Sequence, residues 1–64
     1  MKDNYQEYVG AKIVSIQQGK NERSHITYAQ IRSDDDRLLV SATLEYCVER
    51  MKDAATWIRD NQNV

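Results

Sequence analysis

The first half of the chain carries two runs of β-branched and aromatic residues separated by a polar segment. The run KIVSIQQ, residues 12–18, is rich in Ile and Val, which favour strands. The segment GKNERS, residues 19–24, opens with Gly and suits a hairpin loop longer than two residues. The run HITYAQIR, residues 25–32, predicts a second strand. Its apolar alternation changes midway, which indicates a bulge or burial of both faces.

The stretch RSDDDRLLVSATLEYCVER, residues 32–50, is compatible with two structures. One is a continuous helix, and the other is a third strand over residues 37–42 that leads into a helix over residues 43–60. Val40 and Thr43 are β-branched and therefore poor choices inside a helix. An isolated two-stranded hairpin is also only marginally stable, so the first two strands need a third. We expect the strand followed by the helix.

The acidic segment SDDD, residues 33–36, then becomes the connection of a second hairpin. Asp side chains are common in turns because they accept hydrogen bonds from nearby backbone amides. Calcium loops alternate their ligands and end with a distant Glu, whereas contiguous acids point in diverging directions. We therefore expect a turn rather than a metal site. Thr43 or Ser41 is expected to cap the helix that follows.

The helix has an apolar stripe at helical spacing. Its members are Leu44, Cys47, Val48, Met51, Ala54, Ala55 and Ile58. This stripe is wide enough to cover a three-stranded sheet. The pattern therefore predicts an α+β fold, a three-stranded antiparallel meander packed on one C-terminal helix, in a single domain over residues 1–64.

The N-terminal residues carry a weak helix signature, since Asp3 and Gln6 have capping-box spacing and Gly10 suits a C-terminal cap. The element order is then α-β-β-β-α, or β-β-β-α if this segment frays. Because chain ends are commonly untethered, two alternatives stay open for residues 1–9 and 61–64, an ordered segment and a frayed one.

A third set of helix residues lies beside the apolar stripe. Tyr46, Arg50 and Trp57 fall within about 40° of one another on a helical projection and are expected to be partly exposed. These residue types are the most enriched at the energetic centres of protein interfaces. One hypothesis makes them a partner-binding surface, so that Trp57→Ala weakens association and leaves the fold intact. The alternative is that the sheet or the N-terminal segment covers them at the margin of the core.

Size and composition favour association with another chain. The chain has 64 residues with a net charge of -1, and a protein this short buries only about 60% of its unfolded surface. Cys47 is the single cysteine, which excludes an internal disulfide, and with His25 it cannot complete a zinc site. No segment approaches the length of a membrane span or a secretory signal, so we expect a cytoplasmic protein without a membrane partner.

No combination of residues predicts catalysis. Cys47 falls on the core stripe, where a thiol is inert, and nothing in the pattern places His25 beside it as a base. A Gly-rich phosphate loop is also missing from the sequence. We therefore expect a non-enzyme without catalytic residues, cofactor, metal or small-molecule substrate.

Basic residues collect in the first half of the chain and suggest an alternative function. The candidate nucleic-acid-binding residues are Lys12, Lys20, Arg23, Tyr28 and Arg32. A basic sheet of this kind can follow a phosphate backbone. The same cations also suit solvated strand edges that discourage aggregation.

The predicted order of a short helix, three strands and a long helix resembles the double-stranded-RNA-binding domain, and three strands followed by a helix is similar to the arm-site-binding domains of phage integrases. A double-stranded-RNA-binding domain carries a Lys cluster at the start of its last helix, where this chain has Thr43, Leu44, Glu45 and Tyr46. The integrase domains share no motif with the chain. Because architecture alone does not assign function, the leading hypothesis is a protein-interaction module, an accessory regulator of phage or bacterial type that forms a homodimer or binds a host protein.

Overall fold

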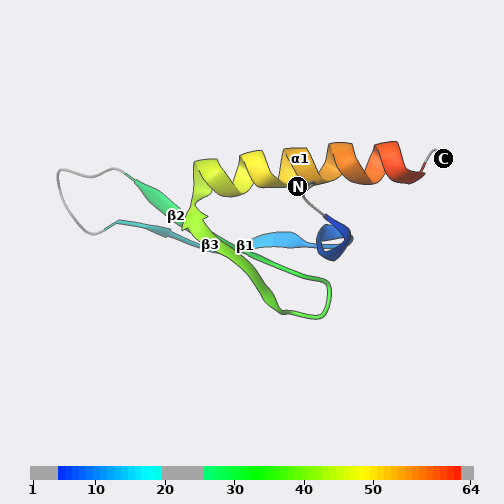
Figure 1. Ribbon diagram of the computed structural model, residues 1–64. Helices are drawn as coiled ribbons and strands as arrows, with labels where there is room; N and C mark the ends of the chain where they lie inside the picture. The colour runs from blue at the N-terminus through cyan, green and yellow to red at the C-terminus, as the bar shows by residue number, and fades with distance from the viewer. Residues whose placement is uncertain (1–4, 20–25, 63–64) are drawn as a thin grey trace.

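The computed structural model describes residues 5–19 and 26–62. A short helical turn is followed by three strands and a long C-terminal helix (Figure 1). The elements are the 3-10 turn η1 (Gln6–Tyr8), the strands β1 (Lys12–Gln18), β2 (Thr27–Arg32) and β3 (Leu38–Thr43), and the helix α1 (Leu44–Gln62). The predicted α+β fold, with the order α-β-β-β-α, is confirmed.

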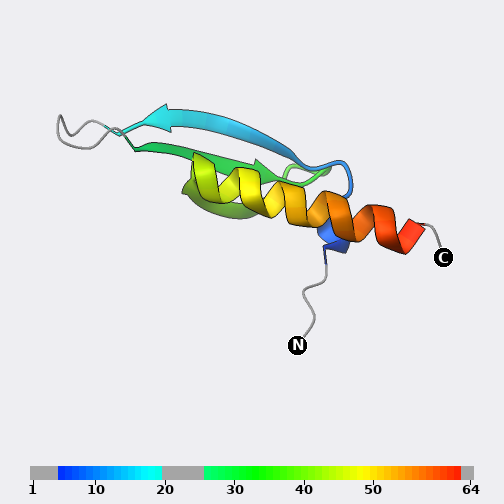
Figure 2. The same cartoon turned by 90° about the horizontal axis from the view of Figure 1, so that it is seen from above.

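The strands form an antiparallel sheet in the order β1-β2-β3, and α1 lies along one face of it (Figures 1 and 2). Ile31 at the centre of the sheet pairs with Ile13 on one side and Val40 on the other, so these three side chains share a face. Ile31 and Cys47 are fully buried. The buried hydrophobic residues of the described chain are few: Tyr5, Tyr8, Ala29, Ile31, Cys47 and Ala54.

Both outer strands are irregular where they pair with the central one. In β1 the register shifts around Ser15, whose φ of 56° lies in the left-handed region. In β3 the extra residue is Leu39, which lies between the partners of Ile31 and Arg32. The sequence suggested either a bulge within the second strand or burial of both its faces. The extra residues instead belong to its two neighbours, and Tyr28 of β2 stays half exposed.

The acidic segment forms the predicted turn between β2 and β3. The Ser33 amide donates to the Arg37 carbonyl at 2.8 Å, and the Asp36 amide donates to the Ser33 carbonyl at 2.9 Å. The Ser33 hydroxyl donates to the Asp35 carboxylate and accepts from the Arg37 amide at 3.0 Å. Asp36 closes the turn with φ 65°, a conformation that Asp tolerates better than most residues.

The helix begins directly after the third strand, at Leu44. The Thr43 hydroxyl oxygen accepts a hydrogen bond from the Tyr46 amide at 3.1 Å, which makes Thr43 the N-cap. A continuous helix reaching back to residue 33 is therefore excluded.

The N-terminal segment lies beneath the second half of α1 (Figure 1). Tyr5 and Tyr8 are each only 7% exposed, so this segment belongs to the core. Gly10 has φ 78°, and a Cβ there would lie 3.3 Å from the Cβ of Asp34, so the segment passes close to the β2–β3 turn. Residues 1–4 lie outside the described part of the chain, and α1 extends to Gln62.

The buried stripe of α1 is rotated from the predicted one. Val48 is 36% exposed and Ala55 is also exposed, whereas Arg50 and Trp57 are half-buried. At about 100° per residue, the centre of the buried side has moved by roughly 50° towards Arg50 and Trp57. The expectation that Val48 and Ala55 are core residues is therefore wrong. The reason is that Tyr5 packs against that flank and supplies apolar surface which the sheet alone lacks.

Candidate functional site

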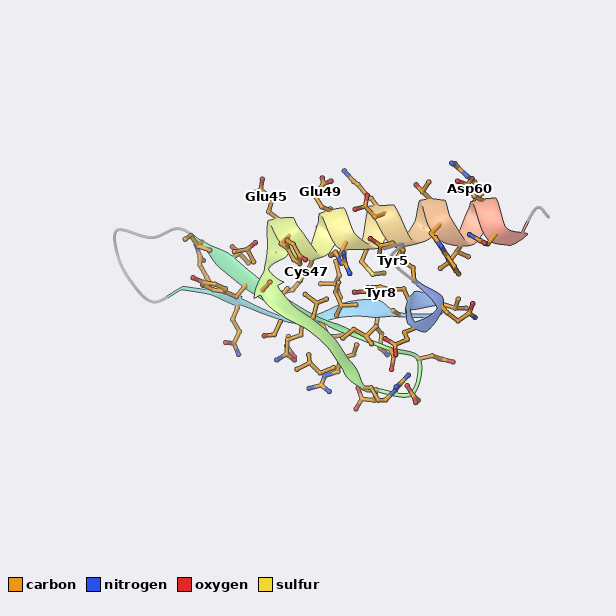
Figure 3. All side chains as sticks on the ribbon, viewed as in Figure 1. Tyr5, Tyr8, Glu45, Cys47, Glu49 and Asp60 are labelled. Carbon is orange, nitrogen blue, oxygen red and sulfur yellow. The ribbon has the colours of Figure 1, made fainter. Side chains whose placement is uncertain are left out.

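Two of the three predicted partner-binding residues lie in a cluster with the N-terminal tyrosines. We call Tyr5, Tyr8, Arg50 and Trp57 the aromatic–arginine cluster. The Arg50 guanidinium carbon lies 5.0 Å from the centre of the Tyr5 ring and 5.9 Å from that of Tyr8. Its Nη1 donates to the Tyr5 hydroxyl at 3.2 Å. The Tyr5 ring lies edge-on to Tyr8 at 5.4 Å and 6.5 Å from Trp57. Figure 3 shows both tyrosines beneath the helix.

These contacts explain why the cluster is part of the fold. A cation over aromatic faces is favourable when partly desolvated, and edge-to-face rings add to the burial of their surface. A hydrogen bond with Tyr8 raises the pKa of Arg50 above its usual value, against the opposing effect of desolvation. The guanidinium is therefore charged at neutral pH, as arginine side chains in proteins generally are. Tyr46, the third predicted residue, is 49% exposed and lies outside these contacts.

An open groove lies at the other end of the helix. It occupies about 620 Å³ between the first two turns of α1 and the end of the β1–β2 hairpin. We call it the hairpin–helix groove, and its lining consists of Ile26, Thr27, Thr43, Leu44, Glu45, Val48 and Glu49. The groove exists because the chain leaves the sheet at Thr43, where pairing with β3 ends, while β2 continues beside β1.

Two of the residues that line this groove are large hydrophobic side chains that remain exposed, Ile26 (44%) and Val48 (36%). Figure 1 shows the β1–β2 hairpin extending beyond the start of α1. Ile16 (59%) is exposed on the same hairpin, whereas Tyr28 (46%) faces away from the helix and Tyr46 (49%) lies on the flank of α1 opposite Val48. Exposed apolar residues that line a groove mark an interaction surface.

Acidic residues form the outer rim of the groove. Glu45 and Glu49 are one helical turn apart, and both project from the side of α1 that faces away from the sheet (Figure 3). Lys52 lies 3.8 Å from the Glu49 carboxylate in a solvent-exposed ion pair, which holds that carboxylate only weakly. Glu45 makes no ion pair with any residue of the described ranges. The groove therefore combines an apolar lining with a negative edge.

The sequence did not reveal this groove. Val48 was assigned to the core because the orientation of the helix was predicted from the pattern of α1 alone. The available signal was the position of Val48, which lies at one edge of the predicted apolar stripe on a helical projection. A residue at the edge of a stripe is the first to be exposed when the buried side of the helix rotates.

Three of the predicted nucleic-acid-binding residues share the sheet face opposite the helix. Tyr28 and Arg32 alternate with buried Ala29 and Ile31 along β2, and Lys12 pairs with Arg32 across the sheet. Arg32 is engaged by Asp36, with its Nη1 donating to the Asp36 carbonyl at 3.1 Å and its Nε 4.0 Å from the carboxylate. Lys20 and Arg23 lie outside the described residues.

Of the remaining polar candidates, the structure describes Cys47 alone, and it takes a structural position. The buried thiol of Cys47 donates to the Ala29 carbonyl at 3.6 Å, and His25 lies outside the described ranges. In residues 5–19 and 26–62, no three His, Cys, Asp or Glu side chains are grouped to hold a metal ion. Within the same ranges, no helix is both long and apolar enough to cross a membrane.

Comparison of the chain with models of protein families, with curated proteins and with solved structures gave no match. The arguments for function therefore rest on the geometry of this chain.

Proposed function

We propose that the protein is a small non-enzymatic protein-interaction module whose binding surface is the hairpin–helix groove. The observation that carries the proposal is the apolar lining of the groove by Ile26, Leu44 and Val48 beside exposed residues of the hairpin end. A concave apolar surface with polar groups at its edge is the usual form of a binding site for a protein segment.

The small core supports the same proposal. Among the described residues only six hydrophobic side chains are buried, which is a small core for a chain of 64 residues. A partner that buries the groove would stabilise the folded state by binding only to it. The proposal places the module in the cytoplasm as an accessory regulator of phage or bacterial type, because a lone thiol such as that of Cys47 stays reduced there.

The leading hypothesis from sequence located binding at Tyr46, Arg50 and Trp57. Tyr46 is available to a partner, but the other two already contact Tyr5, so a partner would have to displace the N-terminal segment to reach them fully. The groove requires no such displacement. We therefore propose it in their place as the main contact.

The experiment that tests this function is selection of a displayed random-peptide library on the folded protein. We expect enriched peptides whose binding is lost in Val48→Asp and retained in Ala55→Asp. Both changes place a carboxylate at an exposed position on the same side of α1, but Ala55 lies two turns beyond the groove. Circular dichroism verifies that both variants are helical. Failure to enrich peptides, or enriched peptides that bind both variants equally, would refute the proposal.

Nucleic-acid binding is the second candidate, favoured by the placement of Lys12, Tyr28 and Arg32 on one sheet face. The pairing of Arg32 with Asp36 reduces the charge available there. Retention on a polyanion column that falls steeply with salt and is weakened by Lys12→Glu would support it, because counterion release makes such binding salt-dependent. Elution at the lowest salt would exclude it.

A further inference from the structure

We infer that the occupant of the hairpin–helix groove is a segment of a foreign protein in which a large apolar side chain stands next to lysine or arginine. This inference rests on the proposed function and adds the chemistry of the partner. Its basis is the combination of an apolar lining with the two carboxylates of Glu45 and Glu49 at one edge.

The apolar part of the occupant follows from the lining. Ile26, just before β2, and Val48, on α1, are 44% and 36% exposed and line the groove together with Leu44 at the start of the helix. A large aliphatic or aromatic side chain placed here would remove both from water. Burial of apolar surface is the main favourable contribution to such binding.

The basic part follows from the charge at the rim. Glu45 has no cation beside it among the described residues, and the Lys52 contact of Glu49 is exposed and easily exchanged. Among the lining residues that the structure describes, the charged ones are these two acids. A lysine or arginine of the partner would therefore gain an attraction that no described lining residue opposes, and an acidic partner would be repelled.

The same charges argue against a second copy of this chain. A symmetric dimer joins the same surface of both subunits, so a two-fold axis through the groove would place Glu45 and Glu49 against their own counterparts. Four carboxylates would then meet at an apolar contact. A foreign segment that carries positive charge avoids this repulsion between carboxylates.

Backbone strain in β1 supports a binding role for the hairpin end of the molecule. Ser15 holds a left-handed conformation at the bulge in β1, which L residues adopt at a cost, and the next residue, Ile16, is the most exposed large hydrophobic side chain described. The bulge therefore leaves a large apolar side chain exposed on the strand that leads to the hairpin end.

The experiment uses one peptide enriched in the library selection and measures its affinity by fluorescence anisotropy. The enriched pool is expected to contain Lys or Arg next to Leu, Ile, Phe or Trp. Exchange of the basic residues of the chosen peptide for Glu is expected to weaken binding by about tenfold or more. Glu45→Lys should weaken the original peptide similarly and strengthen the Glu-containing one.

Asp60→Lys is the matched control, because it makes the same charge change on the same outward side of α1 far from the groove (Figure 3). Asp60→Lys should leave the affinities for the original peptide and for the Glu-containing peptide unchanged. Added salt should reduce the difference in affinity between these two peptides. Selected peptides that need Val48 but show no preference for basic residues, and ignore Glu45→Lys, would overturn this inference and leave the interaction function standing. A wild-type solution mass of a dimer that Val48→Asp converts to a monomer would overturn it in favour of a second copy.

Discussion

The two ends of α1 differ in what lies against them. From Arg50 onwards, the N-terminal segment covers one flank of the helix, and Arg50 and Trp57 contact Tyr5. Before Arg50, the opposite flank, which carries Val48, stays open as the hairpin–helix groove. We call these the closed end and the open end. The comparison shows that burial of a helix residue here depends on the segment packed against it more than on the pattern of the helix itself.

The largest effect is expected from removing the cover of the closed end. Tyr5→Ala deletes a ring that is only 7% exposed and that contacts Tyr8, Arg50 and Trp57, so it should destabilise the fold by about 3 kcal/mol. Urea unfolding followed by circular dichroism measures the change.

The matched control for Tyr5→Ala is Tyr46→Ala, which removes the same ring from a position that is 49% exposed. It should change stability by no more than about 0.5 kcal/mol. Equal losses for the two variants would mean that the closed end is not held by the N-terminal segment.

The next effect is expected at Gly10, where the N-terminal segment passes the β2–β3 turn. Gly10→Ala should destabilise the fold by about 1–2 kcal/mol, because φ is 78° and the new Cβ would lie 3.3 Å from Asp34. Adding Asp34→Gly to Gly10→Ala removes the close contact between the new Cβ and the Asp34 side chain. The cost of a positive φ at residue 10 remains in this double variant. Thermal unfolding of the single and double variants separates the two, and an unchanged midpoint in Gly10→Ala would contradict this geometry.

A smaller effect, this time a gain in stability, is expected from substitution of the two residues whose backbone has a left-handed conformation. Ser15 at the open end has φ 56° and Asp36 at the β2–β3 turn has φ 65°. Exchange of either for Gly should stabilise the protein by about 0.5–1 kcal/mol, since Gly adopts this region without strain but loses more entropy on folding. Denaturant midpoints test this. If Ser15→Gly stabilises the fold and also weakens peptide binding, the strain at the open end serves binding.

The smallest effect is expected from pH at the β2–β3 turn. Hydrogen bonds from Ser33 and then Arg37 lower the pKa of Asp35. Because the folded pKa lies below the unfolded one, Asp35 contributes stability above about pH 4, and this is lost as the pH falls through the folded pKa. Carboxyl NMR titration should show the pKa of Asp35 rising towards its ordinary value in Ser33→Ala. An identical titration in both proteins would contradict the role of the Ser33 hydroxyl.

Much of the fold could be predicted because local chemistry decides it. The β-branched run over residues 12–18 coincides with β1, and the change from Val40 and Ser41 to Leu44 marks where strand gives way to helix. Thr43 was recognisable as a cap because a hydroxyl one residue before a helix satisfies a backbone amide. These features need only a few neighbouring residues, and the sequence shows them directly.

The candidate site could not be predicted because long-range packing decides it. Arg50 lies 45 positions from Tyr5 in sequence, and no periodicity of α1 reveals that this pair sets which flank is buried. Once Tyr5 occupies one flank, Val48 and Ala55 face solvent. The groove therefore follows from a contact on the opposite flank of the same helix. The partner-binding residues predicted from the sequence, Tyr46, Arg50 and Trp57, lie on the flank of α1 against which the N-terminal segment packs.

The most direct test of this account is the affinity of one selected peptide for the wild type, Val48→Asp and Ala55→Asp, measured by fluorescence anisotropy. We expect Val48→Asp to weaken binding by about tenfold or more, because a carboxylate would stand in the apolar lining, and Ala55→Asp to leave it unchanged. Equal affinities for all three proteins, or loss only on substitution of Tyr46, would contradict the assignment of binding to the open end.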